Sequence, residues 1–191
     1  MKIAIDIDEV LSDTLTALIS FHNEKYGTSL KKSDFHSYKY WEVWGGTMEE
    51  AITKVYEFYE SDYFKNINPV QNSQIAVKSL KKHHDLVVVS SRQHEIEEKT
   101  LEWLEKHFPK AFSDVHFTNA YSLSGQSQKK SIVCHYLNAK TLIDDCLDYA
   151  IECSRSMEMV FLFDSPWNRL DLLPYKVRRV RSWNEIVERL K

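Results

Sequence analysis

The chain has 191 residues, a length that suits one domain or one domain with a small insert. Hydrophobic residues make up 43% of it and aromatic residues 13%, which supports a sizeable core and argues against global disorder. The net charge of −3 argues against a general binder of nucleic-acid polymers or membranes, because such proteins need a basic surface.

Two features of the chain predict a cytoplasmic protein. The first strand follows directly on Met1 without a signal-peptide pattern, and no apolar stretch approaches the length of a membrane span. The cysteines, of which there are 3, lack C-x-x-C spacing. This usage favours small core residues in a reducing compartment over disulfides or a zinc site.

An apolar run over Lys2–Ile7 predicts the first strand, and Asp6 and Asp8 lie at its C-terminal end. Carboxylates two residues apart in a period-two element point to the same face. A folded protein rarely brings two carboxylates together without a cation or a proton that relieves their repulsion. By itself the pair fits a functional site and two solvated acids at a strand end equally well, and the rest of the chain decides between the two interpretations.

The segment 13–69 shows helical patterns and no strand pattern. A helix is predicted over Thr14–Tyr26, and a capping box, Thr47–Glu50, opens a second one. The loop between them is rich in aromatic side chains, which either stack on a nucleobase or form a small helical core: Tyr38, Tyr40, Trp41 and Trp44. We predict that residues 13–69 form a helical cap on a core made of residues 1–12 and 70–191.

Strand and helix patterns alternate in the rest of the chain. Strands are predicted at Asp85–Ser90, Val115–Thr118, Lys140–Asp144, Met159–Phe163 and, more weakly, Val177–Val180. Helices are predicted at Asn72–Lys82, Glu95–His107, Ser131–Leu137 and Leu147–Cys153, and a capping box at Ser182–Glu185 opens a last one. This order predicts an α/β fold with a doubly wound, mainly parallel sheet.

Functional groups of such a sheet lie beyond the carboxyl ends of its strands. The groups that this rule collects are Asp6, Asp8, Ser90, Ser91, Arg92, Asp144 and Asp145, with Lys129 or Lys130 from a neighbouring helix. Acids at one rim need a positive partner, and ligands that offer only oxygen favour Mg²⁺. A carboxylate beside Mg²⁺ and a lysine can attack a phosphoryl group and form an aspartyl-phosphate.

The motif order resembles the haloacid dehalogenase superfamily of phosphohydrolases: D-x-D-x-V at 6–10, a serine at 90, a lysine, and paired acids at 144–145. The resemblance implies that Asp6 is the nucleophile and Asp8 the general acid and base. It implies a phosphate site of Ser90, Ser91, Arg92 and Lys130, and a Mg²⁺ site of Asp6, the Asp8 carbonyl, Asp144 and Asp145. Lys130 is preferred to Lys129 because it opens a helix with an apolar face, and Arg92 either grips substrate or pairs with an acid.

The helical insert of residues 13–69, which is the predicted cap, and the tail at 161–169 also resemble the 5′(3′)-deoxyribonucleotidase group. This resemblance implies a 5′-nucleotidase whose partner is a small phosphorylated substrate, in which Tyr40, Trp41 and Trp44 are candidates for substrate contact. A phosphatase for a sugar phosphate and a catalytically idle binding or regulatory member are the alternatives, and a homodimer stays open. Residues Trp167–Arg169 are predicted to form a structural turn set by Pro166.

Overall fold

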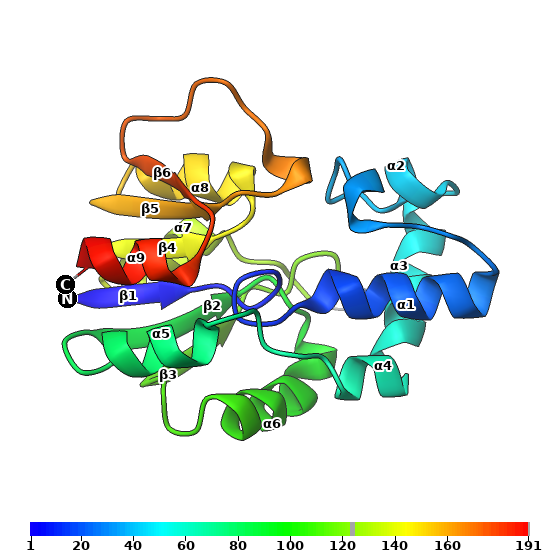
Figure 1. The fold of residues 1–191 in the computed structure, drawn as a ribbon, viewed down its shortest axis with the longest axis horizontal. Coiled ribbons are helices and arrows are strands. Elements are labelled where there is room, and N and C mark those ends of the chain that lie inside the picture. The colour runs from blue at the N-terminus through cyan, green and yellow to red at the C-terminus, as the bar shows by residue number, and fades with distance from the viewer. Residues whose placement is uncertain (123–124, 191) are drawn as a thin grey trace.

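A six-stranded parallel sheet forms the centre of the computed structural model, which describes residues 1–122 and 125–190 (Figure 1). Its strands are β1 (Lys2–Ile5), β2 (Asp85–Ser90), β3 (Asp114–Phe117), β4 (Thr141–Asp144), β5 (Met159–Phe163) and β6 (Val177–Val180). They lie in the order β3-β2-β1-β4-β5-β6, and each neighbouring pair is parallel. The order runs outward from β1 in both directions, which confirms the predicted doubly wound α/β fold.

Different helices cover the two faces of this sheet. On one face pack α5 (Ser73–Leu80), α6 (Glu97–His107) and α9 (Trp183–Leu190), and on the other α7 (Lys130–Tyr136) and α8 (Leu147–Ser154). Ile3 and Ile5 of β1 point into the first core cluster and Ala4 into the second. All three side chains are fully buried, because a parallel sheet with helices on both faces shields its central strand completely.

The elements predicted from the sequence all have counterparts in the structure, with ends that differ by at most two residues. The largest difference at the site is that β1 ends at Ile5 rather than Ile7. The chain curls there because the carbonyl of Ile7 accepts hydrogen bonds from the amides of Val10, Leu11 and Ser12. Glu9, with a φ of 60°, lies inside this curl, so Asp8 stands on a tight loop instead of a strand.

Residues 14–65 hold the four helices α1 (Thr14–Tyr26), α2 (Trp41–Trp44), α3 (Met48–Tyr59) and α4 (Asp62–Lys65), with a 3₁₀ turn at Lys32–Asp34. They stand together beyond the carboxyl end of the sheet (Figure 1). The predicted capping box is present, since Thr47 Oγ1 accepts from the Glu50 amide at 3.2 Å and Glu50 Oε2 from the Thr47 amide at 2.8 Å. Further 3₁₀ turns lie at His94–Ile96 and Pro166–Asn168.

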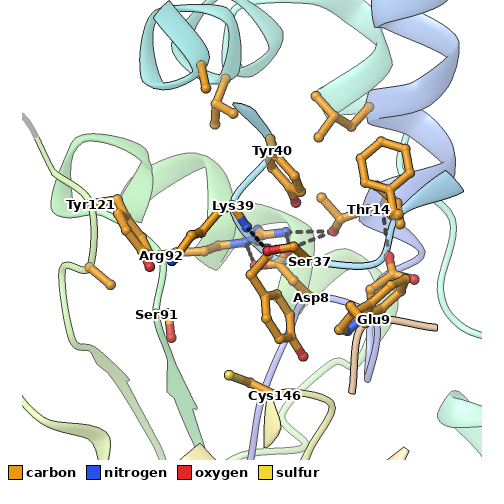
Figure 2. A pocket seen from close by; sticks show the side chains of 18 of the residues that line it. Asp8, Glu9, Thr14, Ser37, Lys39, Tyr40, Ser91, Arg92, Tyr121 and Cys146 are labelled. Carbon is orange, nitrogen blue, oxygen red and sulfur yellow. Dashed lines mark hydrogen bonds and ion pairs between the residues drawn. The ribbon is translucent and has the colours of Figure 1, made fainter. Parts of the chain in front are cut away.

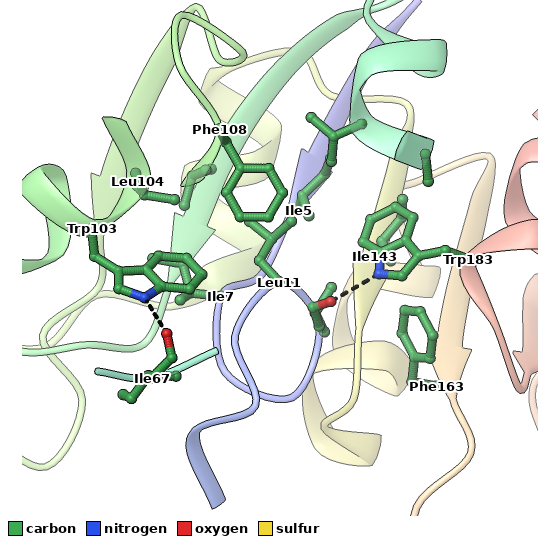
Figure 3. Packing of buried hydrophobic residues seen from close by; sticks show 14 of the residues in the cluster. Ile5, Ile7, Leu11, Ile67, Trp103, Leu104, Phe108, Ile143, Phe163 and Trp183 are labelled. Carbon is green, nitrogen blue, oxygen red and sulfur yellow. Dashed lines mark hydrogen bonds between the residues drawn. The ribbon is translucent and has the colours of Figure 1, made fainter. Parts of the chain in front are cut away.

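Two buried tryptophans fix the ends of the insert against the core (Figure 3). The Trp183 indole donates to the carbonyl of Val10 at 2.9 Å, and the Trp103 indole to the carbonyl of Ile67 at 2.8 Å. The first bond holds the segment that leaves the sheet and the second holds the segment that returns to it. Within the described ranges, every helix is too short or too polar to cross a bilayer.

Candidate active site

Three carboxylates meet where β1 and β4 end side by side. Asp6 directly follows β1, and its amide donates to the carbonyl of Ile143 in β4 at 2.9 Å. Asp144 is the last residue of β4, and Asp145 follows it. One oxygen from each of the three carboxylates lies within 4.8 Å of the others, and all three residues are buried. The three acids therefore meet at the carboxyl ends of neighbouring strands, as the sequence analysis predicted.

Lys130, the first residue of α7, lies among these carboxylates. Its ammonium group is 2.7 Å from Asp144 Oδ2 and 3.0 Å from Asp6 Oδ1. Lys130 is 0% exposed, whereas Lys129 is exposed to solvent. Burial lowers the pKa of the Lys130 ammonium, but Asp144 and Asp6 outweigh burial and raise this pKa well above its usual value. The raised pKa favours the charged form of Lys130 beside Asp6.

This ammonium compensates only part of the negative charge of the cluster. Burial raises the pKa of Asp6 to about 7; Lys130 opposes the rise, while Asp144 and Asp8 add to it. Burial, followed by the charges of Asp144 and Asp6, also raises the pKa of Asp145 well above its usual value. Three carboxylates that share a single ammonium group fit a divalent cation with oxygen ligands.

Asp8 has a different environment, because Arg92 pairs with it. The guanidinium donates from Nη2 to Asp8 Oδ1 at 2.8 Å and from Nε to Oδ2 at 3.1 Å (Figure 2). Thr14 Oγ1 donates to the same Oδ1 at 2.6 Å. Burial alone would raise the pKa of Asp8, but Arg92 and Thr14 hold it below its usual value. Asp8 therefore stands as an ionised carboxylate beside the three-acid cluster.

Arg92 is itself buried and has further partners on both sides. Its Nη1 donates to Thr100 Oγ1 of α6 at 3.1 Å, and its guanidinium lies 5.2 Å from the centre of the Phe64 ring of α4. Of the two roles left open by the sequence, grip on substrate and pairing with an acid, the structure shows the second.

The two serines after β2 differ in their surroundings. Ser91 lines the cavity above the carboxylates (Figure 2). Ser90 is 0% exposed, and its hydroxyl accepts a hydrogen bond from the Arg92 amide at 3.3 Å. Both were predicted to bind phosphate, and Ser91 is the one whose side chain borders the cavity.

The cavity has a volume of about 370 Å³. Its lining is polar on the side of the core and mostly apolar on the side of the insert. Polar groups of the core, among them Asp6, Asp8 and Asp145, form its base. The insert covers it with mostly apolar and aromatic side chains: Leu18, Phe35, Tyr38, Tyr40, Trp41, Ile52, Val55 and Phe58. A charged base beneath an apolar cover suits a ligand with an anionic group and a flat or apolar body.

The cap aromatics predicted as candidates for substrate contact do not share one environment. Tyr40 and Trp41 line the cavity, but Trp44 does not. Trp44 stacks on His22 with ring centres 4.5 Å apart and packs against Tyr40 at 4.9 Å. Its indole therefore belongs to the interior of the insert, which is the core role weighed in the sequence analysis.

Three side chains hold Asp145, and the sequence analysis named them without predicting this contact. Trp167 Nε1 donates to Asp145 Oδ2 at 3.0 Å, and Asn168 Nδ2 donates to the Asp145 carbonyl at 2.7 Å. The turn predicted there exists as Pro166–Asn168, and its place after β5, beside β4, was a usable signal. Tyr38 of the insert also donates to the Asp145 carbonyl, and no local sequence pattern indicates that contact.

Comparisons with known proteins match nearly the whole length of the chain. A family model described as "5′ nucleotidase, deoxy (Pyrimidine), cytosolic type C protein" matches residues 1–190. A 5′(3′)-deoxyribonucleotidase of Bacillus subtilis is 30% identical over 190 residues, which covers 98% of this chain and 97% of that protein. A nucleotidase of Clostridium acetobutylicum is 26% identical and covers 100% of this chain and 95% of its own.

Solved structures with low sequence identity share the fold. A haloacid dehalogenase-like hydrolase of Streptococcus pneumoniae has a TM-score of 0.73 at 11% identity, covering 100% of this chain and 98% of its own. A hydrolase of the same superfamily from Bacillus subtilis, YfnB, was solved with magnesium bound. It has a TM-score of 0.66 at 14% identity and covers 100% of this chain and 98% of its own.

Proposed function

Because the chain belongs to the family described as "5′ nucleotidase, deoxy (Pyrimidine), cytosolic type C protein", we propose that it hydrolyses nucleoside 5′-monophosphates through an aspartyl-phosphate. Family membership confirms the predicted phosphatase of the haloacid dehalogenase superfamily. The observation that carries the mechanism is the placement of Lys130, whose ammonium lies between the carboxylates of Asp6 and Asp144. A nucleophile next to a fixed positive charge is what attack on a phosphoryl group requires.

The proposed cofactor is Mg²⁺, held by Asp6, Asp144, Asp145 and the backbone carbonyl of Asp8. Support comes from the three carboxylate oxygens within 4.8 Å of one another and from the raised pKa values of Asp6 and Asp145. The magnesium bound to the YfnB hydrolase, which shares the fold, adds support. Bound Mg²⁺ would neutralise charge on the phosphoryl oxygens.

The side chains then have distinct parts in the reaction. An oxygen of Asp6 attacks phosphorus, and the bond from phosphorus to the leaving oxygen breaks. Asp8, which is ionised in the free site, relays a proton from the phosphate monoanion of the substrate to that leaving oxygen, and Lys130 and Ser91 stabilise the charge on the transferring group. In the second step water attacks phosphorus, Asp8 takes the proton of that water and passes it to the phosphate product, and the bond to Asp6 breaks. Arg92 holds the Asp8 carboxylate in place throughout.

The proposed substrate class rests on the cover of the cavity. Trp41, Tyr40 and the apolar side chains around them offer surfaces for a nucleobase. Ser37 and Lys39 also line the cavity, but most of the cover is apolar or aromatic, and a polyhydroxylated sugar would need more hydrogen-bonding groups. The relative from Bacillus subtilis, named a 5′(3′)-deoxyribonucleotidase, supports the same choice.

We retain residues 13–69 as the proposed cap and residues 1–12 and 70–191 as the proposed core. The curl at 7–12 and the return at Ile67–Pro69 are the crossings between them, and the isolated bridge from Ser12 to Pro69 joins these crossings. A cytoplasmic location is proposed on the thiols of Cys134, Cys146 and Cys153, which are free and buried.

A phosphatase screen tests the proposal directly. Purified protein is assayed for phosphate release from nucleoside monophosphates, deoxynucleotides and sugar phosphates, each with Mg²⁺ and with EDTA. We expect Mg²⁺-dependent turnover that is fastest with a nucleoside 5′-monophosphate and absent in Asp6→Asn. A sugar phosphate as the best substrate would replace the nucleotidase assignment, and wild-type turnover in Asp6→Asn would overturn the mechanism.

A further inference from the structure

Besides the two crossings of the chain, the cap segment 32–38 also contacts the core at a second seam. Tyr38 of the cap donates its hydroxyl hydrogen bond to the carbonyl of Asp145, and the same hydroxyl oxygen lies 3.3 Å from Asp145 Oδ2. The Tyr38 ring packs edge-on against Trp167, with ring centres 5.9 Å apart. Lys32, from the same cap segment, lies 5.8 Å from the centre of the Trp167 ring.

An ion pair extends this seam to the loop after β1. Lys32 pairs with Glu9, whose side chain is 9% exposed, and lies 3.5 Å from Asp13 Oδ1. Glu9 in turn accepts a hydrogen bond from the amide of Leu15 at 2.7 Å. The cap segment 32–38 is thus attached to both sides of the cavity mouth, at the loop after β1 and at Asp145.

The contact with Asp145 is unusual because Asp145 belongs to the three-acid cluster. Trp167 and Asn168 hold its carboxylate and its carbonyl from the core side, and Tyr38 holds the same residue from the cap side. Groups that hydrogen-bond to a metal ligand orient it, and their loss typically lowers metal affinity. A cap residue in this position connects cap closure to the geometry of the carboxylates.

We propose that Tyr38 is a positioning residue that couples closure of the cap to cation binding by Asp145. The inference rests on the proposed Mg²⁺ site of Asp6, Asp144 and Asp145. Coupling is reciprocal: if the closed cap favours Mg²⁺, then Mg²⁺ favours the closed cap by the same factor. Mg²⁺ should therefore slow amide exchange in two places. One is the segment 144–147, beside the cation ligands, and the other is the cap loop around Tyr38, which lies outside the cation site.

The test is hydrogen–deuterium exchange with and without Mg²⁺, read on peptides that cover 35–40 and 144–147, in the absence of substrate. In the wild type we expect Mg²⁺ to slow exchange in both segments. In Tyr38→Phe, which keeps the ring on Trp167, Mg²⁺ should slow exchange at 144–147 only. The Mg²⁺ affinity of Tyr38→Phe, from calorimetry, should fall by about tenfold, the low end for loss of a group that orients a ligand.

Tyr63→Phe is the matched control, because its hydroxyl donates to Glu24 inside the cap and has no part in the seam. It should behave like the wild type in both measurements. An effect of Mg²⁺ on 144–147 without any effect on 35–40 in the wild type would overturn the coupling and leave the metal site standing. If Mg²⁺ changes neither segment and calorimetry shows no binding, the metal site of the proposed function fails, and the coupling fails with it.

A kinetic measurement separates positioning from a general loss of structure. At saturating Mg²⁺, Tyr38→Phe should lower kcat/KM for a nucleoside 5′-monophosphate, which needs the closed cap, more than for p-nitrophenyl phosphate. Equal losses on both substrates, together with unchanged Mg²⁺ affinity, would mean that Tyr38 only stabilises the fold.

Discussion

The Arg92 guanidinium donates to both carboxylate oxygens of Asp8, from Nη2 to Oδ1 at 2.8 Å and from Nε to Oδ2 at 3.1 Å. This ion pair divides the acids of the site into two kinds. Asp8 has a dedicated cation, whereas Asp6 shares the ammonium of Lys130 with Asp144. Two carboxylates two residues apart therefore differ in what they contribute to stability.

We predict that Asp6→Asn and Asp8→Asn change the stability of the metal-free protein in opposite directions. Asp6→Asn removes charge repulsion with Asp144 and Asp145 and should raise the free energy of unfolding. Asp8→Asn leaves the buried Arg92 without its counter-ion and should lower it by about 1–3 kcal/mol. Urea unfolding in EDTA measures the free energy of unfolding of both variants. A shift in the same direction for the two variants would contradict the division of the acids into two kinds.

A second prediction concerns pH. The folded-state pKa of Asp6 is raised to about 7, so between its unfolded value near 4 and about pH 7 the folded state binds more protons than the unfolded state. The metal-free protein should therefore lose stability as pH rises through this window, by an amount on the order of a few kcal/mol. Saturating Mg²⁺, which binds the ionised carboxylates, should stabilise more at the upper end of the window.

The control for this pH dependence is Asp6→Asn, which lacks the titrating group. Its stability in EDTA should change less between about pH 5 and pH 7 than that of the wild type. The same slope in both proteins would assign the effect to other groups.

Adjacent lysines provide a third prediction, since Lys130 is buried against Asp6 and Asp144 whereas Lys129 is exposed. Lys130→Ala should reduce kcat/KM by the equivalent of about 2.7–4 kcal/mol, as the loss of an oxyanion donor does in other enzymes. Lys129→Ala should have a small effect. Because Lys130→Ala also leaves carboxylates uncompensated, kinetics are compared at a temperature where far-ultraviolet circular dichroism shows both variants folded. A larger kinetic loss in Lys129→Ala would reverse the assignment.

The fourth prediction separates the two tryptophans of α2. Trp41 lines the cavity, so Trp41→Ala should raise KM for nucleoside 5′-monophosphates and spare hydrolysis of p-nitrophenyl phosphate. Trp44 packs on His22 and Tyr40, so Trp44→Ala should lower Tm and reduce activity on both substrates alike. If Trp44→Ala showed the substrate-selective loss instead, the closed arrangement of the cap during turnover would differ from the one described.

The sequence by itself determined the fold and the rim of the site. Its unbroken apolar runs, such as Leu86–Val89 within β2, are strands buried on both faces. The helices between these strands require parallel crossovers. Acids and serines at the ends of these runs must then meet at one edge of the sheet. The helical period after Lys129 even selected Lys130, because the apolar face of α7 sets which of the two lysines turns inward.

Only the tertiary structure decided which side chains from distant segments meet at that rim. Arg92 and Asp8 are 84 residues apart, and Tyr38 and Asp145 are 107 residues apart. A local period tells which face of an element is apolar, but it carries no information on which polar group of another segment will lie opposite. The cap loop shows no hydrophobic periodicity. The different environments of Tyr38, Trp41 and Trp44 therefore follow from how the cap packs on itself and on the core.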